Sequence, residues 1–175
     1  MPNLKRANRW PNNLLEDIFI RKYNKYINDL PADIDKSIEY LLSRLHPNQR
    51  QVLLWFYKDG YTMKEMTKLE GNFTYHYILK CKDHGVKNMV RLSYILIIGY
   101  DNFIKGHKIM EWPISLLVED LKAISYNALE RAGIYTVGDI LQYSKAELML
   151  LDRVHEITIR KVDSRLKDYN LSIRD

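Results

Sequence analysis

Apolar residues recur at intervals of three or four along most of the chain, which is the period of an α-helix. In the segment that starts at Thr74, the residues Ile78, Cys81, Gly85 and Met89 fall on one side of such a helix. The same period predicts further helices at residues 14–26, 34–45, 47–59, 125–132 and 158–169. No Asn-Gly or Asp-Gly pair lies between alternating, strand-like segments. We therefore expect an all-α fold.

Residues that start and stop helices give a second pattern in the middle of the chain. Thr62 and Glu65 form a capping box, Gly71 permits a left-handed stop, and Thr74 can cap the next helix. This order is typical of a helix-turn-helix. Near the C-terminus, short helices are predicted to start at Ser125, at the box of Thr136 with Asp139, and at the box of Ser144 with Glu147.

The division of the chain is read from its turn residues and its length. A chain of 175 residues that is 46% hydrophobic can bury one or two cores. Trp112-Pro113 marks a boundary, because the residue before a proline disfavours helix. We predict an N-terminal arm and helix (1–30), a helix-turn-helix domain (31–105), a linker (106–113) and a small helical domain (114–175).

The helix after Thr74 carries the candidate DNA-binding residues. Between His76 and Arg91 the sequence has four Lys or Arg and one Asp, which favours contact with phosphates. The predicted contact residues are Thr74, Tyr75, His76, Lys80, Lys82, Lys87 and Arg91. A plain solvated helix face is the alternative for the charged residues, and the edge of a core is the alternative for Tyr75 and Tyr77.

Charge and composition narrow the classes of function. The formal net charge is +5, with +3 in residues 1–30, +3 in residues 31–112 and −1 in residues 113–175, so attraction to nucleic acid belongs to the first two thirds. The single cysteine, Cys81, excludes an internal disulfide and fits a reducing compartment. With neither a secretory signal nor an apolar run long enough to span a bilayer, we expect a cytoplasmic protein without a membrane partner.

Catalytic motifs are missing from the sequence. The five histidines are scattered without the spacing of a zinc site, and there is no P-loop, nucleophile elbow or Gly-rich dinucleotide turn. We therefore predict that the protein is not an enzyme and holds neither a cofactor nor a metal.

Residues 45–53, 57–62, Glu65 and Gly71 resemble region four of the bacterial sigma-70 family over about residues 30–95. The resemblance implies a four-helix module that reads promoter DNA in the major groove and docks on the flap of the polymerase β subunit. Trp55 would then be a candidate polymerase contact. Asn72 is read as a one-residue insertion, and Tyr75, His76 and Tyr77 replace the usual Arg and Glu, so base preference is not carried over.

Residues 114–173 resemble the C-terminal domain of the RNA polymerase α subunit, on segments 118–121, 125–129, 132–141 and 171–173. The resemblance implies a helix-hairpin-helix-related fold that grips the minor groove. Here Ile124 stands where that family has Arg, and residues 153–158 replace its glycine-containing turn. Asn127 and Thr158 persist, while Arg153, Arg160 and Lys161 offer a relocated basic patch. With the domain charge at −1, we expect protein contact slightly more than DNA contact.

These features together predict a DNA-binding transcription regulator that acts at promoters with bacterial RNA polymerase. Its expected partners are double-stranded DNA and the polymerase, through the β flap or another subunit, and a homodimer stays open. The alternative is a protein adapter that diverts or inhibits polymerase, or a sigma factor, without binding DNA. A DNA-repair accessory is a third reading, weakened by the missing hairpin glycine. The apolar residues 94–98 are expected to pack under the N-terminal helix. The alternatives are that they form a dimer interface or bind the polymerase flap.

Overall fold

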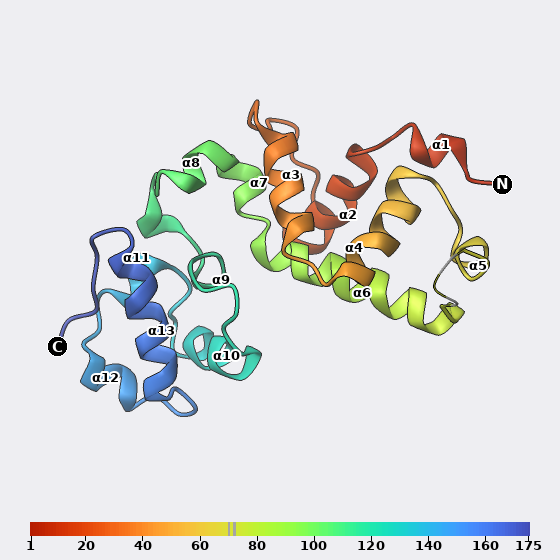
Figure 1. The fold of residues 1–175 in the computed structure, drawn as a ribbon. Helices are drawn as coiled ribbons and strands as arrows, with labels where there is room; N and C mark the ends of the chain where they lie inside the picture. Colours follow the sequence, from red (N-terminus) through yellow and green to blue (C-terminus); the bar gives the residue numbers. More distant parts are fainter. Residues whose placement is uncertain (70, 72) are drawn as a thin grey trace. The chain divides into compact units, whose positions relative to one another are not determined.

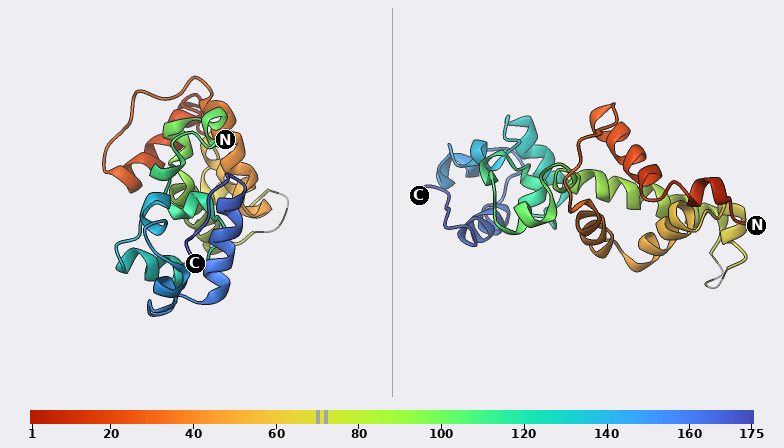
Figure 2. Two further views of the ribbon diagram at one scale, coloured as in Figure 1. Left: turned by 90° about the vertical axis from the view of Figure 1, so that its left-hand side faces the viewer. Right: turned by 90° about the horizontal axis from the view of Figure 1, so that it is seen from above.

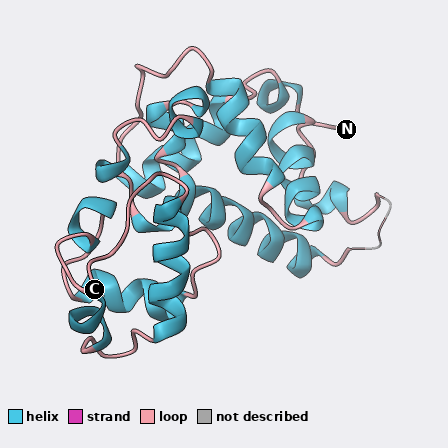
Figure 3. Cartoon of the chain, turned by 60° about the vertical axis from the view of Figure 1, so that its left-hand side comes forward, coloured by secondary structure: helices cyan, strands magenta, loops and turns pink. Residues whose placement is uncertain are grey.

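The computed structural model describes residues 1–69, 71 and 73–175. These residues form helices and loops, and no strand is present among them (Figure 3). The predicted all-α fold is therefore confirmed. The predicted insertion at Asn72 lies outside the described residues. No helix in the described part is both long and apolar enough to cross a membrane.

The protein divides into two compact units, Met1–Tyr100 (unit 1) and Asp101–Asp175 (unit 2). In unit 1, α2, α3, α4 and α5 all pack against the long helix α6 (Figures 1 and 2). The elements of unit 1 are α1 (Leu4–Ala7), α2 (Asn12–Tyr23), α3 (Ile34–Ser43), α4 (Pro47–Leu53), the π-helix η1 (Leu54–Lys58), α5 (Met63–Met66), α6 (Tyr75–Leu92) and α7 (Ile95–Ile98).

The apolar side of α6 is the centre of the unit 1 core. Ile78 and Cys81 are buried with Val52 of α4 and Met66 of α5. One turn further along, Gly85 permits the close approach of α4, because a Cβ there would lie 3.1 Å from Leu53 Cδ1. All four positions of the predicted apolar stripe are buried, so that prediction is confirmed.

Local capping residues set the helix boundaries around α5 and α6. Thr62 and Glu65 form the predicted capping box at the start of α5, and Thr74 caps α6 by accepting a hydrogen bond from the Tyr77 amide at 3.2 Å. Before them, the π-helix η1 ends at Lys58, and Gly60, two residues later, has a φ of +78°. A Cβ at Gly60 would lie 2.4 Å from the Asn3 carbonyl oxygen, so glycine is required where the N-terminus passes.

The basic N-terminal residues fold onto η1. The Asn3 amide donates to the Gly60 carbonyl at 2.8 Å. Arg6 donates to the Tyr61 carbonyl at 3.2 Å, and its guanidinium lies 4.1 Å from the centroid of the Phe56 ring. Residues 1–30, predicted as a separate arm and helix, are therefore part of unit 1.

The apolar run of residues 94–98 contributes to the same unit. Ile95 and Leu96 are fully buried in α7, which packs against α3. The Ser37 hydroxyl of α3 donates to the Ile95 carbonyl at 3.4 Å. Ile95 and Leu96 are therefore part of the core of unit 1.

Unit 2 is organised around Trp112, which is fully buried. Its ring stacks on Phe103 at a centroid distance of 5.1 Å and meets Tyr169 edge-on at 5.5 Å, while its Nε1 donates to the His107 carbonyl at 3.0 Å. The segment 106–113, which we predicted to be a linker, therefore belongs to the core of unit 2, and the units divide after Tyr100. The boundary was predicted at Trp112-Pro113 from the effect of a proline on the residue before it. That rule takes no account of the contacts that Trp112 makes with distant residues.

The helices of unit 2 mostly follow their predicted starts. They are α8 (Tyr100–Ile104, whose first residue is in unit 1), the 3-10 helix η2 (Ile109–Glu111), α9 (Ile114–Leu117), α10 (Ala123–Arg131), α11 (Val137–Ile140), α12 (Lys145–Met149) and α13 (Glu156–Lys167). Both predicted capping boxes are present. The prediction for Ser125 is wrong: α10 begins at Ala123, and the Ser125 hydroxyl is buried, where it accepts a hydrogen bond from Thr158.

Candidate nucleic-acid interface

The side of α6 opposite the core is exposed within unit 1. Among the predicted DNA-binding residues, five are exposed, namely Thr74, Tyr75, His76, Lys80 and Lys87. His76, Lys80 and Lys87 are separated by four and seven positions, which places them along one side of the helix. We call these three residues the basic face of α6. They are the part of the predicted set that the fold brings together.

The tyrosines at the start of α6 have different environments. The Tyr77 ring lies 5.1 Å from Phe73, and its hydroxyl accepts a hydrogen bond from Asn48 of α4 at 2.8 Å. Tyr77 is therefore at the edge of the core. Tyr75 is 55% exposed, against 37% for Tyr77, so of the two it is the candidate for contact with DNA.

Lys82 does not lie on the basic face, and its assignment as a DNA contact is wrong. Its side chain is only 15% exposed, its Nζ lies 3.7 Å from Asp17 of α2, and it also lies 4.5 Å from the centroid of the Phe56 ring. The cause is position, because residue 82 lies one residue from the buried Cys81 on the side that meets α2. Arg91, in the last turn, is half-buried with its Nε enclosed, and offers less surface to a ligand than Lys80 or Lys87.

An ionic network, absent from the predictions, joins α2, η1 and α6. Asp17 accepts hydrogen bonds from the Tyr57 hydroxyl and, at 2.8 Å, from Arg21 Nε. Arg21 also donates to Asp83 at 3.1 Å. Asp83 pairs with Lys87 at 2.8 Å, so the network reaches the basic face. The spacing of four residues between Asp17 and Arg21, and again between Asp83 and Lys87, is the signal that sequence reasoning had available.

The network changes the acidity of its members. Burial alone would raise the pKa of Asp17, but the hydrogen bonds from Tyr57 and Arg21 and the charge of Lys82 outweigh it and lower that pKa. Burial lowers the pKa of Lys82 in spite of the nearby Asp17 carboxylate. Burial, together with the hydrogen bond to Asp17, raises the pKa of Tyr57. Asp17 is therefore a charged acceptor at neutral pH.

Replacing this acceptor tests the network. We expect Asp17→Asn to lower the free energy of unfolding of unit 1 by about 1–3 kcal/mol at pH 7, because Arg21, Lys82 and Tyr57 lose a charged partner. A group with a lowered folded-state pKa stabilises the fold above its unfolded pKa, and this contribution is lost as pH falls through the folded value. The gap between wild type and variant should therefore close as pH falls from the ordinary pKa of 3.8 through the lower folded one.

Urea unfolding of both proteins at pH 7 and near pH 3, followed by a probe placed in unit 1, measures this gap. Asp29→Asn, which changes an exposed acid in the same unit, serves as the control and should cost little at either pH. A gap for Asp17→Asn that is the same at both pH values contradicts the assignment.

Helix α4 borders the other edge of the basic face. Gln49 accepts a hydrogen bond from Asn88 Nδ2 at 3.2 Å, which links α4 to α6. His84 is exposed and follows Lys80 by four residues, so it extends the polar surface of α6. It was absent from the predicted set because single histidines carry little signal. A shallow hollow between the two helices is lined by His46, Gln49, Tyr77, Lys80, Cys81 and His84.

Two histidines in one hollow do not make a metal site. His46 and His84 both line the hollow beside α4, but a third ligand is needed to hold an ion firmly. Within residues 1–69, 71 and 73–175, no group of three or more His, Cys, Asp and Glu is placed to hold a metal ion. The hollow is therefore treated as part of the polar surface of α6.

Trp55, the candidate polymerase contact, is half-buried on η1. Its ring packs against Phe73 at a centroid distance of 6.2 Å. The remaining surface borders a hollow with Asp59, Tyr61 and Leu69. Trp55 therefore belongs to the core and also reaches the surface.

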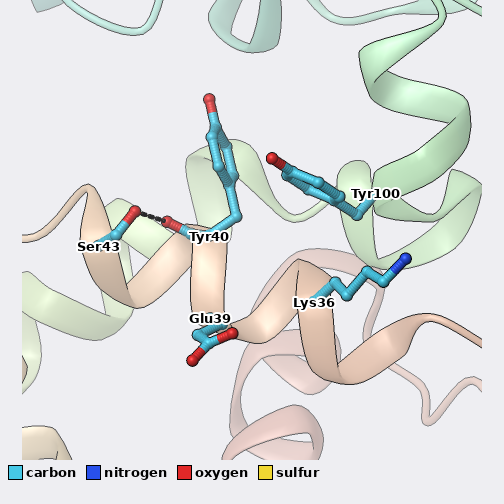
Figure 4. A pocket seen from close by; sticks show the side chains of 5 residues that line it. All are labelled: Lys36, Glu39, Tyr40, Ser43 and Tyr100. Carbon is cyan, nitrogen blue, oxygen red and sulfur yellow. Dashed lines mark hydrogen bonds between the residues drawn. The ribbon is translucent and has the colours of Figure 1, made fainter.

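Another hollow of unit 1 lies beside α3, away from the predicted site residues. Tyr40 and Tyr100 both line it, and Figure 4 shows their rings next to each other. The ring centroids lie 5.6 Å apart. The Ser43 hydroxyl donates to the Tyr40 carbonyl at 2.6 Å. Lys36 and Glu39 complete the lining with opposite charges, so this hollow has no clear preference for an anion.

The second predicted contact set, in unit 2, is only partly accessible. Asn127, Arg153 and Arg160 are exposed. Thr158 is buried, because its hydroxyl donates to Ser125 at 3.0 Å and joins α10 to α13, so its assignment as a contact residue is wrong. Lys161 pairs with Asp120 at 2.6 Å.

The predicted basic patch of unit 2 is balanced by acids. Arg153 lies 3.5 Å from Asp152, and Arg160 lies 3.9 Å from Glu156. Around them, two isoleucines are exposed at helix starts, Ile124 at 49% and Ile157 at 58%. They precede the hydrogen-bonded Ser125 and Thr158, so the starts of α10 and α13 are adjacent. This surface is apolar and mixed in charge, which is unlike a phosphate-binding surface.

Residues 106–168 match the family model of the C-terminal domain of the bacterial RNA polymerase alpha subunit. DNA-directed RNA polymerase subunit alpha of Carboxydothermus hydrogenoformans is 40% identical over 67 residues, which are 38% of this protein and 21% of that relative. The same subunit of Acidothermus cellulolyticus is 36% identical over 64 residues, 35% of this protein and 19% of the relative.

The protein thus spans about a fifth of the length of the curated relatives it matches. No solved structure matches it. The protein is all-α in its described part, and its second unit contains a domain similar to the C-terminal domain of the polymerase alpha subunit.

Proposed function

We propose that this protein is a DNA-binding transcription regulator that acts at promoters with bacterial RNA polymerase. The observation that carries the proposal is the basic face of α6, where His76, Lys80 and Lys87 are exposed while the opposite side is buried on α4 and α5. A helix with one buried side and one exposed, basic side is suited to the major groove, which is about 12 Å wide.

The elements before α6 support this use. α5 and α6 pack on each other and are connected by residues 67–74. In a helix-turn-helix, the second of two such packed helices enters the groove. The resemblance of residues 30–95 to sigma region four agrees with such a role and stays a prediction. With 18 residues, α6 is about 27 Å long, so its exposed side can lie along the groove while its apolar side stays packed.

In this proposal, unit 2 directs the protein to the transcription machinery. Its similarity to a domain of the polymerase alpha subunit supports a role in transcription. Its cations lie beside acids, and the starts of α10 and α13 expose Ile124 and Ile157. Protein contact suits this surface better than phosphate contact.

A salt titration tests the proposal. The full-length protein is bound to a promoter-length duplex between 50 and 200 mM salt, and the logarithm of the binding constant is plotted against the logarithm of salt. Three or four phosphate contacts predict a slope of about −3. A slope near zero, or no binding at 50 mM salt, would exclude DNA recognition by α6.

A second candidate function is that of an adapter that binds polymerase without DNA, and the hollow beside Trp55 favours it. An aromatic ring that is partly open at a hollow is a common anchor for a protein partner. Trp55→Ala and Asp59→Lys should then reduce capture of purified polymerase by the full-length protein. Asp59 is exposed, so its replacement leaves the fold intact, and Asp29→Lys is the matched control. Unchanged capture by Asp59→Lys and Trp55→Ala counts against the adapter.

A further inference from the structure

We propose that the first two turns of α6 recognise thymine through its methyl group, with Leu79 and Tyr75 as the specificity-determining residues. This inference rests on the proposed function, because it concerns which bases the helix reads in the groove.

Leu79 is a large aliphatic residue in an exposed position. It is 43% exposed, whereas its neighbour Ile78 is fully buried. Tyr75 is 55% exposed and precedes Leu79 by four residues, so the two side chains are neighbours on the surface of the helix. They form an apolar edge of about one helical turn beside the basic face. About half of each of these side chains is open to solvent.

The polar side chains nearby leave few other ways to read a base. Adenine is read by Asn or Gln, and guanine by Arg or Lys. Residues 75–84 contain no Asn, Gln or Arg, and Lys80 is the exposed lysine among them. The Tyr77 hydroxyl is engaged by Asn48, and the Asp83 carboxylate is engaged by Arg21 and Lys87. Apolar contact with the methyl group of thymine is the readout that Leu79 and Tyr75 can supply.

The position of the apolar edge agrees with this role. Around the axis of α6, Leu79 lies between Tyr75 and His76, about 40° from the first and about 60° from the second, and Lys80 lies beyond His76. A phosphate held by His76 and Lys80 would therefore place the base edges of the groove against Leu79. The inferred preference is for thymine at one or two positions of the site, next to phosphates bound by the basic face.

Uracil substitution tests the inference. A preferred duplex is selected in vitro with the full-length protein, and each thymine is then replaced singly by uracil, which removes only the methyl group. We expect about a four-fold loss of affinity at each contacted thymine, the value of one buried methyl-sized group. In Leu79→Ala, thymine and uracil should bind equally at the position that Leu79 contacts. Ile20→Ala, which changes an aliphatic residue of α2 that is 56% exposed, should keep the difference.

The outcomes separate this inference from the proposed function. If the selected duplex binds tightly and every uracil duplex binds as well as its thymine parent, methyl recognition is overturned while DNA binding stands. If Leu79→Ala weakens both duplexes equally and keeps the difference between them, Leu79 is not the reader. If no duplex is selected at all, the proposed function itself fails.

Discussion

Removal of both lysines from the basic face of α6 is expected to weaken duplex binding by about 30-fold near physiological salt and to reduce the salt slope by about 2. Lys80 and Lys87 are both exposed, and Lys87 has a side chain that is 64% exposed. Each would release about one counterion equivalent from the duplex. The double variant Lys80→Ala/Lys87→Ala and the wild type are compared by fluorescence anisotropy at several salt concentrations.

The control is a second double variant with the same change of charge. Lys25→Ala/Lys58→Ala removes two exposed lysines that lie outside α6, so affinity should fall by no more than a few-fold through the net charge. Equal losses in the two double variants would mean that only net charge matters, and the assignment of α6 as the contact helix would then be wrong. Circular dichroism of all three proteins checks that the helices are retained.

Trp112→Ala is expected to have the largest effect on stability, with a loss of about 3–5 kcal/mol in the free energy of unfolding of unit 2. The side chain is fully buried, stacks on Phe103, meets Tyr169, and donates a hydrogen bond to His107. Its removal leaves a large cavity in a small core. Hydrogen exchange measured by mass spectrometry should show faster exchange in α10 and α13, and unchanged exchange in α6.

Two outcomes decide how residues 106–113 are assigned. If they form the core of unit 2, Trp112→Phe should lose much less stability than Trp112→Ala, because a ring still fills most of the space. If they are a linker, both variants should exchange like the wild type. Exchange separates the units, which a single unfolding transition of a two-unit protein does not.

The sequence predicted the structure correctly where a feature depends on residues close together in the chain. The capping boxes at Thr62, Thr136 and Ser144 are all present, because each depends on two side chains three residues apart. The apolar stripe of α6 is buried because residues spaced by three or four positions lie on one side of a helix, and that side packs against the core.

Tertiary contacts explain what the sequence did not reveal. Ser125 has the composition of a helix cap, yet its hydroxyl pairs with Thr158, which is 33 residues away. Lys82 has the charge of a DNA contact, yet it faces Asp17 and the ring of Phe56. Both errors arise because residue type was read without its partner on another helix. The sequence therefore indicated that Lys80 and Lys87 lie on the exposed side of α6, but it did not reveal that Lys82 lies against the protein. Their contact with DNA stays a prediction.

The pairing of Lys87 with Asp83 has a consequence for the strength of binding. A phosphate that approaches Lys87 must take the place of a carboxylate that the protein supplies from one turn earlier on the same helix. Asp83 is in turn held by Arg21, so this internal competitor is kept in position. In the proposed complex with DNA, this ion pair would weaken attraction to arbitrary duplexes and would leave discrimination among sequences to the uncharged contacts.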